Sequence, residues 1–267
     1  MKKTEEDELF KNGNLIAKNL KGEINFNEVS MSYDLEKKVL NSISFEILKG
    51  EKIGLVGRTG CGKTSLVSLL NRSYEFQSGE IIIDHHSIRD YERNSLRQEI
   101  GIVSQDVQLF KGTLKENLLQ GYFLSDGELF EACKNFGLNE SLKINTIEDF
   151  NLEVLDNGIN FSVGQKQLIQ LIRILLKNPS ILILDEATAN IDKYHEEKIH
   201  EALFDRMKNK TCLIIAHRLD TLKECDRIFY FDRGQLIESG PYQELLNLKK
   251  NFYELQKSNY NETNQYI

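Results

Sequence analysis

The sequence contains no tryptophan, two prolines and four cysteines. So few prolines exclude a collagen-like chain and a proline-rich linker, both of which depend on that residue. The cysteines are far apart, at Cys61, Cys133, Cys212 and Cys225, and no two of them form a C-x-x-C pair. Their spacing therefore indicates neither a zinc site nor a disulfide framework.

Long apolar runs and an excess of positive charge are missing as well. The apolar runs, such as Cys212–Ala216, stop after about five residues, whereas a bilayer span needs about 20. The chain has 34 lysines and arginines against 41 aspartates and glutamates, a net charge of −7. This balance argues against a nucleic-acid coat protein and a polybasic membrane anchor. We therefore expect a chain that binds no nucleic acid and does not cross a membrane alone.

The 267 residues are enough for one large or two modest domains. Short apolar runs alternate with helical patterns, which predicts an α/β fold with a largely parallel core sheet. Three of the early strands alternate apolar and polar residues, a pattern compatible with antiparallel pairing. The predicted strands are Glu23–Val29, Ser42–Ile47, Lys52–Val56, Glu80–Asp84, Ile181–Asp185 and Thr211–Ala216, and a closing hairpin of Ile228–Phe231 and Gln235–Ser239.

The middle section, residues 125–178, lacks a strand pattern and is predicted to be a helical subdomain. Its first helix is expected to begin after Ser125, because a serine followed three residues later by Glu128 is typical of a helix N-terminus. We divide the chain into an N-terminal extension (1–21), one main domain (22–258) and a polar tail (259–267).

The segment Gly57–Thr64, GRTGCGKT, fits the P-loop pattern G-x-x-x-x-G-K-[ST] and stands between a predicted strand and a predicted helix. Its glycines let successive backbone N–H groups point at a phosphate, and the helix N-terminus adds partial positive charge. Lys63 is expected to reach the β and γ phosphates, and the hydroxyl of Thr64 to bind Mg²⁺. A glycine-rich turn that binds nothing is the alternative, and it fits this context poorly.

The nucleotide-binding residues predicted here are Gly57, Arg58, Thr59, Gly60, Cys61, Gly62, Lys63, Thr64 and Ser65. Cys61 lies among the amides that would hold the phosphates. We therefore expect a thiol reagent on Cys61 to block nucleotide binding, and bound ATP to protect the thiol.

The run ILILDEAT, Ile181–Thr188, ends a predicted strand with two carboxylates, at the end where open α/β sheets bind ligands. Asp185 is suited to hold Mg²⁺, directly or through water, and Glu186 to polarise a water for attack on the γ-phosphate. Acid pairs at strand ends are also common as solvated termini. Taken alone, this pair supports both interpretations equally, and beside a P-loop the catalytic one is favoured.

The segment NFSVGQKQ, Asn160–Gln167, immediately precedes an apolar helical pattern. Ser162, Gly164 and the first N–H groups of that helix could form a second phosphate-binding helix start. One nucleotide has no need of two such sites. On spacing alone, an ordinary helix capped by Ser162 is the better interpretation.

Six motifs, in order and spacing, resemble the nucleotide-binding domain of an ABC transporter of the exporter type. They are GRTGCGKT, the SQD around Gln105, FSVGQ, ILILDEAT, the NID around Asp192 and the AHR around His217. The resemblance extends from about Gly22 to Lys257. It implies a P-loop NTPase core, a mixed sheet flanked by helices, with an antiparallel β subdomain and an inserted α-helical subdomain.

The resemblance also implies ATP hydrolysis with Mg²⁺, coupled to transmembrane export. In such proteins two ATP molecules lie between two domains arranged head to tail, and FSVGQ of one domain serves the ATP on the P-loop of the other. Ser162, Val163, Gly164 and Gln165 match this signature, and Asp192 matches an aspartate that crosses the dimer interface. The implied partners are a second nucleotide-binding domain and the transmembrane domains of a transporter, at the cytoplasmic face of a membrane.

Three more residues match functional positions of the family. Tyr33, in VSMSYD, matches the aromatic residue that stacks on adenine, although a tyrosine on a strand face would look the same. Gln105 matches the glutamine that senses Mg²⁺ and faces the membrane domains. His217 matches the histidine that contacts the γ-phosphate, while without the family a lone histidine after a strand is more often structural. The implied catalytic residues are Glu186, His217 and Gln105, and the implied metal ligands are Thr64, Gln105 and Asp185.

Several segments, including GRTGCGKTS and GINFSVGQKQL, resemble most closely the second cassette of the C (multidrug-resistance-associated) subfamily. Val163 stands where the common signature has its first glycine. A β-branched residue does not readily adopt a positive φ, so we expect weaker binding or turnover at the site that this signature serves. Ser104 replaces a frequent proline and is expected to be tolerated. Because Glu186 is present, the chain's own P-loop site is expected to be hydrolytic.

Two other functions stay open on the sequence. One is a soluble ABC ATPase that acts on ribosomes, DNA repair or complex assembly, and the other is a regulatory cassette in which Val163 makes one half-site degenerate. A GTPase is disfavoured, because the sequence has neither an N-K-x-D base reader nor a D-x-x-G switch. The exporter-like segments favour the motor domain of a transporter.

Overall fold

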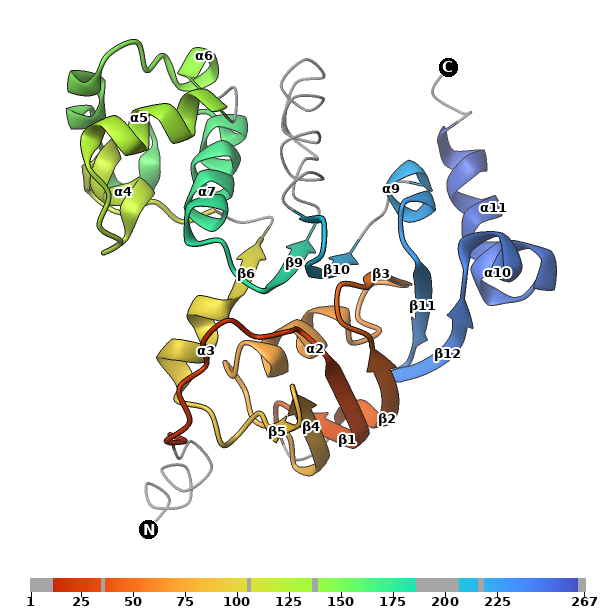
Figure 1. Ribbon diagram of the computed structural model, residues 1–267. Coiled ribbons are helices and arrows are strands. Elements are labelled where there is room, and N and C mark those ends of the chain that lie inside the picture. Colours follow the sequence, from red (N-terminus) through yellow and green to blue (C-terminus); the bar gives the residue numbers. More distant parts are fainter. Residues whose placement is uncertain are drawn as a thin grey trace. The chain divides into compact units, whose positions relative to one another are not determined.

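The computed structural model describes residues 12–34, 37–104, 107–135, 139–185, 207–215 and 219–263. The chain divides into two compact units, and Figure 1 labels most of their helices and strands. The first unit comprises Met1–Ile100, Ser180–Ile183 and Asn209–Ile267, and the second comprises Gly101–Pro179 and Leu184–Lys208.

The first unit contains an antiparallel sheet of four strands in the order β2-β1-β4-β5. This confirms the antiparallel β subdomain. β2 begins before the predicted Ser42. The backbone of Ser42 has a positive φ of 49°, and the pairing of β1 with β2 shifts register nearby, which interrupts the apolar–polar alternation. The strands are β1 (Ile24–Ser32), β2 (Lys38–Ile47), β4 (Ser78–Ile83) and β5 (His86–Ser87).

The core sheet has six strands in the order β12-β11-β3-β10-β9-β6. β3 pairs in parallel with both β10 and β11, whereas β11 and β12 form the predicted antiparallel hairpin. The sheet is therefore mixed, as the sequence predicted. β6 and β9 begin in the first unit and end in the second. The strands are β3 (Lys52–Gly57), β6 (Ile100–Val103), β9 (Ile181–Asp185), β10 (Thr211–Ile215), β11 (Arg227–Asp232) and β12 (Gln235–Gly240).

Five described helices belong to the first unit: α2 (Lys63–Leu70), α3 (Arg93–Glu99), α9 (Leu219–Lys223), α10 (Tyr242–Leu248) and α11 (Asn251–Thr263). The buried carboxylate of Glu238 accepts hydrogen bonds from the backbone N–H groups of Asn251 and Phe252, at 2.7 and 3.3 Å, and so caps α11. That helix continues into the predicted polar tail as far as Thr263.

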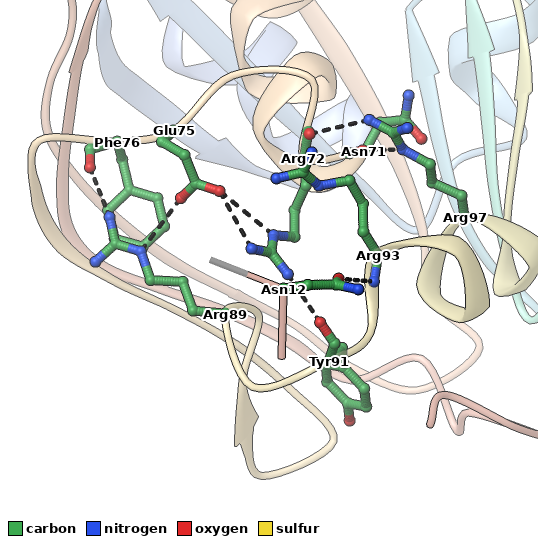
Figure 2. Close-up of polar contacts among 9 residues, drawn as sticks. All are labelled: Asn12, Asn71, Arg72, Glu75, Phe76, Arg89, Tyr91, Arg93 and Arg97. Carbon is green, nitrogen blue, oxygen red and sulfur yellow. Dashed lines mark hydrogen bonds and ion pairs between the residues drawn. The ribbon is translucent and has the colours of Figure 1, made fainter. Parts of the chain in front are cut away.

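A buried arginine holds the connection between α2 and α3 (Figure 2). Arg72 is 1% exposed, and its guanidinium donates to the carbonyl oxygen of Tyr91 at 2.8 Å and to Oε1 of Glu75 at 3.4 Å. Arg89 pairs with the other carboxylate oxygen of Glu75 at 3.2 Å and donates to the carbonyl of Phe76 at 2.7 Å. Two arginines thus share one buried carboxylate, which offsets the cost of its desolvation.

The described part of the N-terminal extension lies along α3. The backbone N–H of Leu15 donates to the carbonyl of Asp90 at 2.9 Å, and that of Ala17 donates to Oγ of Ser95 at 2.9 Å. Figure 2 shows the next contact toward the N-terminus, in which Oδ1 of Asn12 accepts from the N–H of Arg93 at 2.8 Å. From Asn12 onward the extension is therefore a fixed part of the first unit.

The second unit is mainly helical (Figure 1). Its α-helices are α4 (Leu114–Leu119), α5 (Asp126–Asn135), α6 (Asn139–Leu142) and α7 (Val163–Lys177), and its 3-10 helices are η1 (Ile147–Asn151) and η2 (Asp156–Gly158). Ser125 and Glu128 exchange hydrogen bonds at the start of α5, as the sequence predicted. The range 125–178 also holds a strand, β8 (Glu153–Val154), whose partner β7 (Gly112–Thr113) lies outside that range.

Within the described ranges, every helix is too short or too polar to span a bilayer.

Candidate functional site

The P-loop joins β3 to α2, between the strand and helix that the sequence predicted. Gly57, Gly60 and Gly62 have φ values of 147°, 78° and 111°, a region that side-chain-bearing residues rarely adopt. A Cβ on Gly57 would lie 2.1 Å from the carbonyl oxygen of Phe231, so this position admits only glycine. Gly62 caps α2 in the left-handed conformation, and the loop curls directly onto the helix N-terminus.

The side chain of Lys63 lies over this loop. It is 9% exposed, and its ammonium donates to the carbonyl oxygens of Gly57 at 2.7 Å and Arg58 at 3.3 Å. These contacts fix a positive charge against a loop whose curled backbone and helix N-terminus favour anions. The arrangement is suited to binding phosphate groups.

A turn that the sequence analysis did not single out supports the P-loop. The N–H of Gly234 donates to the carbonyl of Cys61 at 3.0 Å, and the carbonyl of Gly234 accepts from the N–H of Asn41 at 2.9 Å. Gly234 has a φ of 76°, and a Cβ on it would lie 2.3 Å from the carbonyl oxygen of Val39. In the sequence, Asp232-Arg233-Gly234 indicates only the turn of the predicted closing hairpin.

The side chains of the remaining P-loop residues differ in how exposed they are to solvent and ligands. Cys61 is 3% exposed, so a thiol reagent reaches its sulfur only when the loop opens, which the sequence-based expectation did not foresee. The side chain of Thr64 is exposed and can offer its hydroxyl to a ligand. Ser65 is buried, and its Oγ lies 2.9 Å from the hydroxyl of Tyr33.

The ring of Tyr33 is thereby tied to α2. Tyr33 is 50% exposed and contacts Tyr74 edge to face, with ring centroids 4.8 Å apart and planes at 87°. Tyr74, which the sequence analysis missed, belongs to the connection after α2. Two contacts therefore orient a half-exposed aromatic ring beside the start of the phosphate-binding helix, where a nucleobase could stack on it.

The signature residues begin α7 in the second unit. Oγ of Ser162 accepts from the N–H of Gln165 at 3.2 Å, and the Gln165 side chain accepts from the N–H of Ser162 at 3.0 Å, which forms a capping box. Val163 is the first helical residue, and its φ is not positive. The backbone argument for a weakened half-site is therefore wrong, because a β-branched residue fits this conformation. The weaker half-site itself stays a prediction, and it now depends on the Val163 side chain, which is 57% exposed.

Asp185 ends β9 with a partly buried side chain. Gln105, Glu186, Asp192 and His217 lie outside the described residues.

The donors expected to hold Mg²⁺ are the hydroxyl of Thr64, the carboxylate of Asp185 and the amide oxygen of Gln105. All are oxygen donors of the kind that Mg²⁺ prefers, so the residue types fit. No cluster of three or more histidine, cysteine or acidic side chains that could hold a metal occurs in the part of the chain that the structure describes.

Comparison with known proteins agrees with this geometry. Residues 40–189 match the family described as "ABC transporter". The chain is 40% identical over 239 residues to the putative ABC transporter ATP-binding protein exp8 of Streptococcus pneumoniae, covering 90% of this chain and 41% of that protein. It is 42% identical over 235 residues to a putative multidrug export ATP-binding/permease protein of Staphylococcus aureus, covering 87% of this chain and 40% of that protein.

A solved structure is also similar. It is that of a bacterial Atm1-family ABC exporter with ATP bound, and it superimposes with a TM-score of 0.85 at 32% identity. The match covers 93% of this chain and 43% of the other. The chain thus spans less than half the length of these relatives.

Proposed function

Because the chain belongs to the ABC transporter family, in which this domain binds and hydrolyses ATP, we propose that it is the motor domain of an exporter. It would drive transport by closing head to tail on a second nucleotide-binding domain around two ATP molecules. The ABC ATP-binding domain is proposed to occupy residues 22–258. The transmembrane domains that it would serve are joined to it in one chain or supplied by another, and the domain would lie at the cytoplasmic face of their membrane.

The observation that supports this proposal most is the P-loop. Three glycines with positive φ curl the backbone between β3 and α2, and the ammonium of Lys63 lies over the curl at 2.7 Å from the carbonyl of Gly57. A triphosphate matches this charge and shape, because its oxygens can accept from several N–H groups and the ammonium together. Tyr33, hydrogen-bonded to Ser65, supplies an aromatic ring for the adenine at the same end of α2.

The chemistry is assigned to residues by type and motif. Glu186 would polarise the attacking water, and His217 would contact the γ-phosphate as its charge develops. Thr64, Asp185 and Gln105 would hold Mg²⁺, which neutralises charge on the β and γ phosphates when bound.

The second phosphate-binding helix start is assigned to the partner's ATP. Ser162, Gly164 and the first N–H groups of α7 would bind the γ-phosphate held by the facing domain, and Asp192 would cross the interface. This assignment explains why one chain carries two such helix starts. An exposed Val163 between Ser162 and Gly164 would then face the partner's nucleotide and weaken that site.

We also propose the narrower assignment to the second cassette of the C subfamily. Val163 in FSVGQ and the presence of Glu186 support it. An upstream coding sequence with apolar spans and another cassette that lacks the catalytic glutamate would agree with it. An upstream sequence that ends after one set of spans would contradict it, and one without spans would favour the soluble ABC ATPase over a cassette fused to its transmembrane domains.

ATP hydrolysis by the 267-residue chain tests the motor function. Lys63→Ala should abolish ATP binding, while Lys49→Ala, which removes an exposed lysine, should match the wild type. Glu186→Gln should bind ATP, fail to hydrolyse it and form a dimer with ATP in size measurements. Unchanged hydrolysis in Glu186→Gln would overturn the catalytic assignment.

A further inference from the structure

The helix that begins with the signature also contacts the chain immediately before Gln105. Gln170, in the middle of α7, faces Ser104, the residue after β6. With its amide oriented so that both polar atoms are satisfied, Gln170 donates to the carbonyl oxygen of Ser104 at 2.9 Å. Its amide oxygen accepts from the Ser104 N–H at 3.2 Å and from the Ser104 hydroxyl at 2.9 Å. The Gln170 side chain thus hydrogen-bonds to both the N–H and the carbonyl oxygen of Ser104, in the way that a neighbouring β-strand would.

The same helix contacts the chain on the other side of Gln105. Arg173 is 6% exposed, and Nη1 of its guanidinium donates to the carbonyl oxygen of Gln108 at 3.1 Å. Nη2 donates to Oδ1 of Asn117 at 2.9 Å, and Nε donates to the carbonyl oxygen of Asn117. Asn117 in turn donates to the carbonyl of Phe110 at 2.8 Å and accepts from its N–H at 3.1 Å. The backbone after Gln105 is therefore held at Gln108 and at Phe110.

Both contacts come from one face of one rigid element. Gln170 and Arg173 are three residues apart and so project from the same side of α7. α7 is 15 residues long, capped by Ser162 at its start and ended by Asn178 in the left-handed conformation. A helix with intact ends transmits a displacement of its N-terminus along its whole length.

We propose that Gln170 is a positioning residue, which together with Arg173 clamps both sides of the Gln105 segment to α7. The residues that flank Gln105, Ser104 and Gln108, then move with the signature of the same chain as one body. The proposal rests on the proposed function, in which Gln105 serves the ATP on this chain's P-loop and the signature serves the partner's ATP. The clamp therefore couples the two nucleotide sites through one helix. The sequence offers no family motif at Gln170 that would have identified this role.

Gln170→Leu is the first test, because leucine preserves the volume and helix propensity of the side chain but removes its hydrogen bonds. Loss of these contacts should lower kcat for ATP about five-fold, the factor expected for one net hydrogen bond. KM should change less than about two-fold, because the P-loop contacts are untouched. Ser104→Ala is the matched comparison: it removes only the hydroxyl bond and keeps the backbone pair, so its kcat should fall less than that of Gln170→Leu.

A double-mutant cycle distinguishes positioning from a general loss of stability. If Gln170 acts through Gln105, then Gln170→Leu should reduce kcat no further in a Gln105→Ala background. Independent, additive losses of kcat in the two variants would overturn the proposal, as would wild-type kcat in Gln170→Leu.

Hydrogen exchange gives a readout that needs no ATPase activity. The amides of residues 107–110 should exchange faster in Gln170→Leu, while those in the centre of α7 stay protected as in the wild type. Unchanged exchange at 107–110 would overturn the clamp even in an active enzyme. A chain that hydrolyses no ATP, with the expected exchange pattern, would overturn the proposed function but not the clamp.

Discussion

The hydroxyl of Tyr33 lies 2.9 Å from Oγ of Ser65, which ties the exposed ring to the helix that follows the P-loop. Tyr74 contacts the same ring edge to face. An aromatic ring held at two points loses little freedom when a base stacks on it, so stacking of adenine on Tyr33, as we propose, would cost little entropy.

Removing this ring should weaken ATP binding. Stacking of a base on an aromatic side chain contributes roughly 1–3 kcal/mol, so Tyr33→Ala should raise the Kd for ATP about ten-fold. Tyr33→Phe, which loses only the hydrogen bond to Ser65, should raise the Kd for ATP by less. Calorimetric titration measures both, and inorganic triphosphate, which lacks a base, is the control ligand. If Tyr33→Ala weakens triphosphate binding as much as ATP binding, the ring does not serve the base.

Two glycines of the P-loop should differ in their tolerance of alanine. At Gly57 an added Cβ would lie 2.1 Å from the carbonyl oxygen of Phe231, so Gly57→Ala should displace the loop and abolish ATP binding. At Gly60 no atom lies within 4 Å of the added Cβ, and the cost is that of the left-handed φ alone, about 1 kcal/mol. Thermal unfolding and ATP titration of both variants check this order. Equal losses in the two variants would show that the contact with Phe231 is unimportant.

Val163→Gly should raise ATP turnover without changing stability much. The exposed valine begins α7 with no positive φ, so its replacement relieves no backbone strain. A surface change of this kind shifts the free energy of unfolding by about 0.5 kcal/mol or less. Steady-state hydrolysis and urea unfolding measure the two effects. Turnover equal to the wild type would contradict the weakened half-site.

The shared carboxylate of Glu75 predicts unequal effects for its two arginines. Arg72→Ala removes a buried partner of a buried carboxylate and the bond to Tyr91, so it should lower the free energy of unfolding by about 3 kcal/mol. The Arg89 side chain is 43% exposed, and Arg89→Ala should lower the free energy of unfolding by about 1 kcal/mol. Urea denaturation compares the two, and a larger loss in Arg89→Ala would refute this order.

The cysteines should be unreactive in the folded protein. Burial raises the pKa of Cys133, Cys212 and Cys225 to about 12, so almost none of each is thiolate near pH 8. Because the neutral thiol is favoured in the folded state, this contribution to stability is complete below pH 9 and is lost as the pH rises toward 12. Cys61 is also buried.

Labelling by an aromatic disulfide reagent at pH 8, with and without urea, checks the cysteine prediction. All four thiols should react only on unfolding, and ATP should slow the reaction of Cys61 the most. A Cys61→Ser variant shows how much of the labelling signal comes from the Cys61 thiol. Rapid labelling of the folded wild type, absent in Cys61→Ser, would show that the P-loop opens freely.

The fold was predictable where local patterns sufficed. The run ILILD forms β9 with the predicted bounds, because a short apolar run that ends in an aspartate is a strong local signal for a buried strand. β6 was missed, because Ile100–Val103 is only 4 residues long and contains a glycine, which weakens a strand pattern. The start of β2 was missed, because the positive φ of Ser42 shifts the alternation on which strand prediction depends.

The candidate site, like the fold, was predictable only where its residues belong to a local motif. The P-loop motif was recognisable in the sequence because a phosphate-binding turn needs glycine and lysine at fixed spacing, which is a local requirement. Gly234, Tyr74 and Gln170 were not found, because their partners are distant in the chain. Gly234 contacts Cys61, Tyr74 contacts Tyr33, and Gln170 contacts Ser104 only after folding.

The sequence by itself determined the family and the nucleotide and predicted the residues of the P-loop and signature, because these motifs depend on residue type and short-range spacing. The tertiary structure decided what surrounds them: that Val163 begins a helix without backbone strain, that Cys61 is buried, and that α7 holds both sides of the Gln105 segment. Burial and long-range hydrogen bonds depend on which segments pack together, and no local pattern encodes that.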